Sequence, residues 1–579
     1  MKLTYIILIG YLISAVFIYG QTQLTIPDTL SGTNFNLTVK SGTVNFYPGF
    51  VTNTMGVNGN YLGPTLILRK GEHVQINVTN SLTDTTTIHW HGMHVAPEND
   101  GGPHTVILPG TTWQPQFTVM DNAATYWYHP HLHKKTNEHV TKGVSGFIIV
   151  RDSNEAKINL PRRYSVDDFP IVVQSRAFDA NKQFLFKSEL DSVILVNGTK
   201  NPYLQVPSQV VRLRLLNGST ERTYNFGLKG NKSFYQIAGD GGLLNVPILF
   251  TRLRLAPGER AEILVDFSSM QGQTTYLMSY ASDLSNGIIG ARQVGMGING
   301  IPNYSNNKLN GADFNILRID VIAPTVNPIT TIPTSLTTNI PWNTASVNAT
   351  RILTFTSTGG MMNVVGPFVI NGVPFNMNTI NYNVPLNNIE IWELRNQTLV
   401  AHPFHIHDVQ FYLLDRNGSA VPSNEKGRKD VVLVLPLETV RFITKFENFS
   451  NSMVPYMYHC HLLTHEDDGM MGQFLVTNTT DVEIENPSLP NEFLLMQNYP
   501  NPFNPSTVIG YQLSIAGHVT LKVYDILGRE VATLVNEYQT AGLHHSQFAI
   551  INSQLPSGVY LYRIQAGYFT ETKKMIISK

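Results

Sequence analysis

The sequence predicts an all-β protein assembled from several β-sandwich domains. Helical periodicity is scarce, whereas short stretches of alternating apolar and polar residues, punctuated by Gly, Pro and Asn, recur along the chain. Three such stretches end on Asn: Val74–Asn80, Val211–Asn217 and Ile389–Asn396. The closing Asn residues lie 137 and 179 residues apart. This spacing indicates one β-domain repeated three times, and short strands in a chain of this size favour sandwiches.

The N-terminus has the pattern of a secretory signal over residues 1–20. Met1-Lys2-Leu3 precedes an apolar run from Tyr5 to Tyr19, and Gly20 supplies a small residue at its end. The alternative, a membrane anchor, is weaker because the run is shorter than the ~20 residues that span a bilayer. We therefore expect an exported protein, although its single cysteine allows no internal disulfide.

Composition and Pro-rich segments predict the domain boundaries. The chain has 579 residues, 42% of them hydrophobic and 14% charged, so packed cores are feasible and disorder is not expected. A net charge of −1 without a long basic run argues against nucleic acid as a partner. We expect domains at 22–155, 160–322 and 343–482, a linker at 483–498 and a separate unit at 499–579. That last unit is too short to be a fourth copy of the repeat.

The only cysteine of the chain, Cys460, lies between His459 and His461. Thiolates select copper(I), zinc or iron–sulfur clusters, and imidazoles suit copper and zinc. A single thiolate cannot hold an iron–sulfur cluster, which needs several. Copper is therefore the first hypothesis for this site.

Four His-x-His pairs support a metal-binding interpretation. One pair alone is weak, because two surface or packed histidines explain it equally well, but four pairs use eight of the 18 histidines. Residues i and i+2 of a strand project from the same face, so each pair offers two imidazoles to one region. The pairs are His89/His91, His129/His131, His405/His407 and His459/His461.

The same alternation predicts two metal sites on opposite sides of one strand. If His459 and His461 face one way, Cys460 faces the other, where the unpaired His402 and His465 can join it. Two His and one Cys with a weak axial Met form the blue-copper electron-transfer set. Met470 is the candidate axial ligand, although Met471 is adjacent and either side chain could simply fill the core.

The repeats indicate which domain supplies which ligands. The stretch 126–131 matches 456–461, but Pro130 stands where the third repeat has Cys460. The first repeat therefore cannot build a blue-copper site. The comparable stretch of the middle repeat, 275–280, has no histidine. We expect the middle domain to be a spacer without metal, and the eight paired histidines to meet between the first and third domains.

These motifs closely resemble the four copper motifs of the multicopper oxidases, in the bacterial laccase and cuprous-oxidase branch, over about residues 45–480. The resemblance implies three cupredoxin-like Greek-key β-sandwich domains and four coppers: one type 1, one type 2 and two type 3. His89 and His405 match the type 2 ligands. His402, Cys460, His465 and axial Met470 match the type 1 ligands. The matches to the type 3 pair are His91, His129, His131, His407, His459 and His461.

The family reaction implied by this resemblance oxidises four one-electron donors and reduces O2 to two waters. Asp100 matches the acid that the family places near type 2 copper, and Glu466 matches the acid near the type 3 pair. Such carboxylates can relay protons and orient ligand histidines, although both could instead be solvated loop acids. We expect packing or surface roles for the remaining histidines: His73, His94, His104, His133, His139, His518, His544 and His545.

The C-terminal residues 499–579 alternate like a small β-sandwich with a basic end, which could be a generic interaction module. The segments 499–507, 523–531 and 557–563 closely resemble the C-terminal sorting domain of the type IX secretion system. That resemblance implies passage through the periplasm, contact with the type IX machinery, removal of the tail by proteolysis, and a secreted or cell-surface enzyme.

The sequence leaves four hypotheses for the function. The leading one is an oxidase of phenols, aromatic amines or reduced metal ions. A cuprous oxidase for copper detoxification is weakened because only Met361, Met362 and Met377 gather early in the third domain, with no long Met-rich helix. Three repeats and eight paired histidines disfavour a copper nitrite reductase. A non-catalytic copper-binding surface protein is the alternative outside the enzymes.

Overall fold

A computed structural model describes residues 20–186, 190–295, 300–478, 493–504, 506–550 and 555–578. The predicted signal peptide, apart from Gly20, and most of the predicted linker 483–498 lie outside these residues. The described chain is built from strands, with only short helices: α1 (Pro97–Asp100), α2 (Thr136–Lys142) and α3 (Leu463–Asp467). The predicted all-β fold is therefore confirmed. Among the described residues, no helix has the length and apolarity that a membrane span requires.

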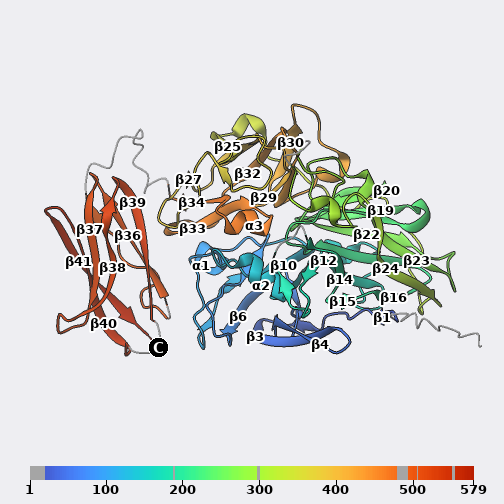
Figure 1. Ribbon diagram of the computed structural model, residues 1–579, viewed down its shortest axis with the longest axis horizontal. Coiled ribbons are helices and arrows are strands. Elements are labelled where there is room, and N and C mark those ends of the chain that lie inside the picture. Colours follow the sequence, from blue (N-terminus) through green and yellow to red (C-terminus); the bar gives the residue numbers. More distant parts are fainter. Residues whose placement is uncertain are drawn as a thin grey trace, which may run out of the picture.

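The first domain is a sandwich of two five-stranded sheets (Figure 1). One sheet has the order β2 (Thr29–Ser31), β5 (Thr65–Arg69), β11 (Gly146–Arg151), β10 (Ala124–His129) and β7 (His89–His91). The other has β4 (Phe50–Val57), β3 (Asn34–Tyr47), β6 (His73–Asn80) and β8 (Thr112–Trp113), with β9 (Gln116–Thr118) also on β6. Their facing apolar side chains form one buried core that includes Trp90 and Tyr128.

The middle domain has a six-stranded and an eight-stranded sheet. The six-stranded sheet runs β1 (Thr22–Gln23), β16 (Pro202–Pro207), β24 (Asp313–Ile322), β23 (Thr274–Tyr280), β18 (Tyr224–Leu228) and β21 (Leu253–Leu255). The eight-stranded sheet runs β15 (Thr199–Lys200), β14 (Val193–Val196), β12 (Asp168–Phe178), β17 (Val210–Asn217), β22 (Arg260–Asp266), β19 (Phe234–Gly239) and β20 (Gly242–Phe250), with β13 (Phe184–Leu185) on β12. The N-terminal strand β1 thus pairs with a middle-domain sheet.

The third domain repeats the two five-stranded sheets. One runs β26 (Phe368–Ile370), β25 (Ala349–Ser357), β28 (Ile389–Asn396), β32 (Thr439–Lys445) and β30 (Tyr412–Arg416). The other runs β27 (Tyr382–Pro385), β34 (Met471–Thr477), β33 (Asn451–Cys460), β29 (His402–Ile406) and β31 (Val431–Val434). Its core includes Trp392 and also Cys460, so the cysteine is part of the packed interior.

The closing Asn of each repeated strand has the same structural role in all three domains. Asn80, Asn217 and Asn396 end β6, β17 and β28, and each side-chain Nδ2 donates to a backbone carbonyl four or five residues later in the following loop. Each Oδ1 accepts the backbone N–H two residues later. The buried side-chain amide thus both donates to and accepts from backbone groups of the loop, which explains why the strand ends on Asn.

The C-terminal unit packs a three-stranded sheet against a four-stranded one around its own apolar core. The sheets are β35 (Leu494–Leu495), β36 (Ser506–Leu513) and β39 (Gly542–Ala549), and β38 (Glu530–Gln539), β37 (Gly517–Tyr524), β40 (Gly558–Ala566) and β41 (Phe569–Ile577). The unit lies beside the first and third domains, on the side away from the middle domain (Figure 1). Gln547 Nε2 donates to the carbonyl of His104 across this contact (2.9 Å).

Candidate metal centres

Paired strands in the first and third domains bring the His-x-His motifs together. In the first domain β7 is antiparallel to β10, and His89 lies opposite His129. In the third domain β29 is antiparallel to β33, and His405 lies opposite His459. Non-adjacent strand residues of the same parity share a face, so each domain presents its imidazoles as a group.

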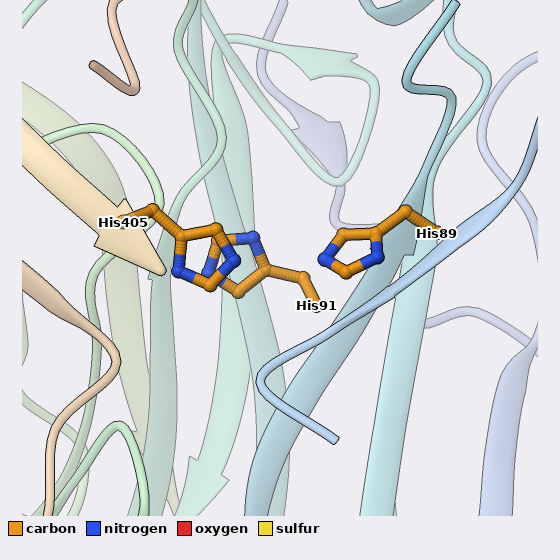
Figure 2. A group of neighbouring side chains, drawn as sticks. All are labelled: His89, His91 and His405. Atoms are coloured by element: carbon orange, nitrogen blue, oxygen red, sulfur yellow. The ribbon is translucent and has the colours of Figure 1, made fainter. Parts of the chain in front are cut away.

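The eight paired histidines meet in one buried cluster between these two domains. Potential ligand atoms lie within 4.8 Å of one another in two separate triads, one of His91, His129 and His461 and one of His131, His407 and His459. His89 and His405, together with His91, form a third group. Figure 2 shows the ring of His89 facing the stacked rings of His91 and His405, whose centroids are 3.8 Å apart.

Oxygen atoms outside the cluster orient most of these rings. Backbone carbonyls accept from Nδ1 of His89, His129 and His405 at 2.8–2.9 Å, which turns each Nε2 inward. The carboxylate of Asp100 accepts from Nδ1 of His407 (2.7 Å). The carboxylate of Glu466 lies 3.1 Å from His459 Nδ1 and 3.5 Å from His131 Nδ1. Both predicted acids are therefore buried against predicted ligands, rather than solvated.

The inward nitrogens have the properties of metal ligands. Nε2 of His89, His405 and His407 and both ring nitrogens of His461 are buried without a hydrogen-bond partner. Burial lowers the pKa of six of these imidazoles, and repulsion from the neighbouring imidazoles lowers it further. The pKa falls to about 3 for His131 and His461. It falls well below the usual range for His91, His129, His405 and His407. These six rings are thus neutral. An unsatisfied buried polar atom costs about 1–3 kcal/mol, which a bound cation would remove.

A second group of donors surrounds Cys460. Its Sγ lies 3.5 Å from His402 Nδ1 and 3.8 Å from His465 Nδ1, and these two nitrogens are 3.3 Å apart. Thr398 Oγ1 lies 2.9 Å from the far nitrogen of His402, which directs its Nδ1 toward the sulfur. The ring of Phe368 covers both imidazoles, at 4.8 Å from His402 and 4.4 Å from His465. The side chains flanking Cys460 belong to the eight-histidine cluster instead.

The chemistry of this second group fits copper. Cys460 is 1% exposed, and burial raises the pKa of its thiol, so only a nearby cation would keep it as a thiolate. A thiolate with two imidazoles is a soft and mixed donor set of the kind that copper prefers. Met470 is fully buried beside it, and its carbonyl accepts from the Cys460 N–H (3.0 Å). The next residue, Met471, begins β34 and lies opposite His459 of β33.

The middle domain, which we expected to be a spacer, places residues next to the eight-histidine cluster. Arg260 donates to both carboxylate oxygens of Asp430 at 2.6 Å, and Asp430 Oδ1 lies 3.2 Å from His91 Nε2. A Cβ on Gly258 would lie 2.9 Å from the His461 ring. Sequence reasoning missed these residues, because nothing in their local pattern separates them from an ordinary turn and strand start. Within the described residues, no group of three or more donors includes a middle-domain residue.

The remaining histidines have other partners. His94 Nδ1 lies 2.8 Å from Asp408 Oδ1 and 3.0 Å from the Asp408 carbonyl, His104 contacts Gln473 and His139 contacts Thr86. The ring of His133 packs against Phe375 with centroids 5.3 Å apart. Across the part of the chain that the structure describes, none of the eight histidines expected to have packing roles joins a group of three donors.

Comparison with family profiles identifies four matching regions. The description "Multicopper oxidase" applies to residues 38–155, 168–307 and 345–480. The description "Secretion system C-terminal sorting domain" applies to residues 497–578.

Known proteins match the chain over most of its length. It is 36% identical to the multicopper oxidase Mco of Staphylococcus haemolyticus, over 79% of this chain and 93% of that protein. It is 30% identical to the cell division protein FtsP of Escherichia coli, over 79% of this chain and 93% of that protein. A solved laccase-like multicopper oxidase, CueO from Ochrobactrum, is 32% identical with a TM-score of 0.69, over 78% of this chain and all of that one.

Proposed function

This chain belongs to the multicopper oxidase family, and from that premise we propose that it is a secreted four-copper oxidase. It couples the one-electron oxidation of phenols, aromatic amines or reduced metal ions to the reduction of O2. Four electrons and four protons convert each O2 into two waters. The observation that carries the proposal is the connection of two donor clusters by one tripeptide, His459-Cys460-His461.

The proposed ligand sets follow the two clusters. Type 1 copper would be held by His402, Cys460 and His465, with Met470 as the fourth ligand. Type 2 copper is held by His89 and His405. The type 3 pair is held by the two triads, one of His91, His129 and His461 and one of His131, His407 and His459, whose atoms converge within 4.8 Å. Copper bound in these sites supplies the one-electron redox chemistry.

Cys460 has two tasks in this proposal. Its thiolate would hold type 1 copper beside His465, which at 8% exposure is the most accessible of the three donors His402, Cys460 and His465. Its backbone also joins that ion to the type 3 ligands, because His459 and His461 are its covalent neighbours. The route between the centres therefore needs no diffusing intermediate. The apolar rings that enclose Cys460, including Phe368, exclude water from it.

Asp100 and Glu466 orient ligands and handle protons in this proposal. Asp100 accepts a hydrogen bond from Nδ1 of His407. The carboxylate of Glu466 lies 3.1 Å from Nδ1 of His459, which also lies 3.0 Å from the Cys460 carbonyl. These outer oxygens hold each ring with its other nitrogen inward. Burial alone would raise the pKa of Glu466, but its interactions with His131 and His459 outweigh burial and lower this pKa. Glu466 is therefore ionised and able to accept a proton at Oε1 or Oε2.

The C-terminal unit supports an extracellular destination. A sorting domain implies a secretion machinery that recognises it. Together with the predicted signal over residues 1–20, it supports export through the periplasm and then by the type IX system to the medium or the cell surface. Mass spectrometry of the protein from culture medium tests this: a secreted enzyme that has lost its first ~20 residues is expected, and retention of the enzyme in the cytoplasm would contradict it.

A reduced metal ion is the second candidate donor. Met361 and Met362 are 52% and 39% exposed in the loop before β26, and Phe368 of that strand contacts His465. Thioethers bind Cu(I), so this loop could present a cuprous ion near the electron entry point. A cuprous oxidase for copper detoxification would use it.

Oxygen uptake by the copper-loaded enzyme tests the proposal. A phenol, Cu(I), Fe(II) and Mn(II) are supplied separately, and each rate is compared with that of the metal-free protein. We expect four donor equivalents per O2 without accumulation of hydrogen peroxide. A protein that holds four coppers but consumes no oxygen with any donor would instead be a non-catalytic copper-binding surface protein.

A further inference from the structure

His91 is turned the opposite way from the other oriented rings of the cluster. In His89, His129, His405 and His407, Nδ1 faces an oxygen outside the cluster and Nε2 faces inward. In His91, Nε2 faces the outside, 3.2 Å from Asp430 Oδ1. Its Nδ1 faces inward and lies 3.3 Å from His129 Nε2.

Asp430 can hold this orientation because its own carboxylate is fixed. Arg260 Nη1 donates to Oδ1 and Nη2 donates to Oδ2, both at 2.6 Å, so the carboxylate is bound by a planar two-pronged donor. Oδ1 is then left facing His91, while the backbone carbonyl of Asp430 accepts from His405 (2.8 Å). One residue thus contacts a predicted type 3 ligand and a predicted type 2 ligand.

The residues around this ion pair leave enough space for it. Gly92 directly follows His91, and a Cβ there would lie 2.3 Å from Asp430 Oδ2 and 2.7 Å from Arg260 Nη2. Its φ of +86° is also in the region that favours glycine. Arg260 is itself tied by its other donors to the carbonyls of Thr125, Gly258 and Asp240. The pair is completely buried where all three domains meet.

We infer that Arg260 of the middle domain is a positioning residue for the oxygen-reducing centre: by binding Asp430, it keeps His91 turned with Nδ1 toward copper. The inference rests on the four-copper function proposed above. It also gives the middle domain a role, because docking of this domain completes the ligand geometry. Loss of such an outer hydrogen-bond partner typically weakens metal binding by about 10–100-fold.

Arg260→Lys tests the inference, because lysine keeps the charge but cannot donate two parallel hydrogen bonds. Copper per chain is measured during titration with a chelator, and electron paramagnetic resonance and absorption spectra identify which coppers remain. We expect the three coppers of the histidine cluster to be lost at about 10–100-fold lower chelator concentration, with a changed type 2 signal. The blue absorption that depends on Cys460 should persist.

Arg214→Lys is the matched control. Arg214 is equally buried in the same domain and binds Asp168 with two donors, but its hydrogen bonds reach Asp168, Glu262 and Thr125 rather than any histidine. Wild-type copper retention in Arg260→Lys would overturn the inference, and so would an equal loss in both variants. If Arg260→Lys does not fold, Asp430→Asn replaces it, since an amide cannot accept from both prongs of Arg260. Fewer than four coppers in the wild type would instead contradict the proposed function.

Discussion

Gly258 lies against a predicted type 3 ligand, and its replacement by alanine should displace that ligand. A Cβ at Gly258 would lie 2.9 Å from the His461 ring, whereas ordinary contacts begin near 3.4 Å, so the ring must move by about 0.5 Å. A misplacement of ~1 Å can reduce turnover by ~100-fold. We therefore expect oxygen uptake to fall by about 10-fold in Gly258→Ala, with loss of part of the copper that we propose binds the eight-histidine cluster.

The backbone contributes a separate cost that a control can remove. Gly258 has a φ of +83°, a conformation that costs alanine about 1–2 kcal/mol. Gly272 of the same domain has a φ of +77° with no atom within 4 Å of the added Cβ. Gly272→Ala should therefore lose similar stability in denaturant titrations, yet keep wild-type oxygen uptake and copper content. Equal oxygen uptake and copper content in the two variants would refute the contact argument.

Three further predictions concern other groups of the structure. Cys460→Ser should abolish the blue absorption, and a variant that stays blue would remove Cys460 from the type 1 site. Glu466→Gln should slow oxygen reduction by about 10–100-fold while the blue absorption stays, and unchanged turnover would exclude Glu466 from the mechanism. Burial lowers the pKa of His94, but Asp408 and Asp121 outweigh it and raise this pKa from 6.5 to about 9. The resulting stabilisation of about 3 kcal/mol is complete below pH ~6.5 and is lost as the pH rises through about 9. His94→Asn should thus destabilise strongly at pH 6 and little at pH 10 in denaturant titrations; equal losses at both would contradict this.

Much of the architecture could be read from local patterns. The alternation of apolar and polar residues predicted the repeated strands. The Asn at the end of each strand indicated a turn, and its Oδ1 accepts the same backbone hydrogen bond in all three domains. The family and the C-terminal sorting domain also followed from short motifs, and both are confirmed. The ligand assignments remain predictions, which the buried and convergent histidines support.

The sequence predicted that the paired histidines meet between the first and third domains, but not which of their atoms come together, because these contacts join distant residues. His131 Nε2 and His459 Nε2 lie 3.1 Å apart although 328 residues separate them. The pairing of His-x-His motifs into two triads is a property of how two domains dock. The reversed ring of His91 depends on Asp430, 339 residues away, and no local pattern specifies that contact.

Three features follow from the amino-acid sequence alone: the kind of domain, the number of repeats, and the opposite sides that Cys460 and its flanking histidines occupy. These features depend on the alternation of side chains along one strand, which is a local property of the backbone. The contribution of the middle domain depends instead on how the three domains pack together. Arg260 reaches Asp430 across 170 residues, and Gly258 leaves room for His461, because the three domains pack around one buried cluster.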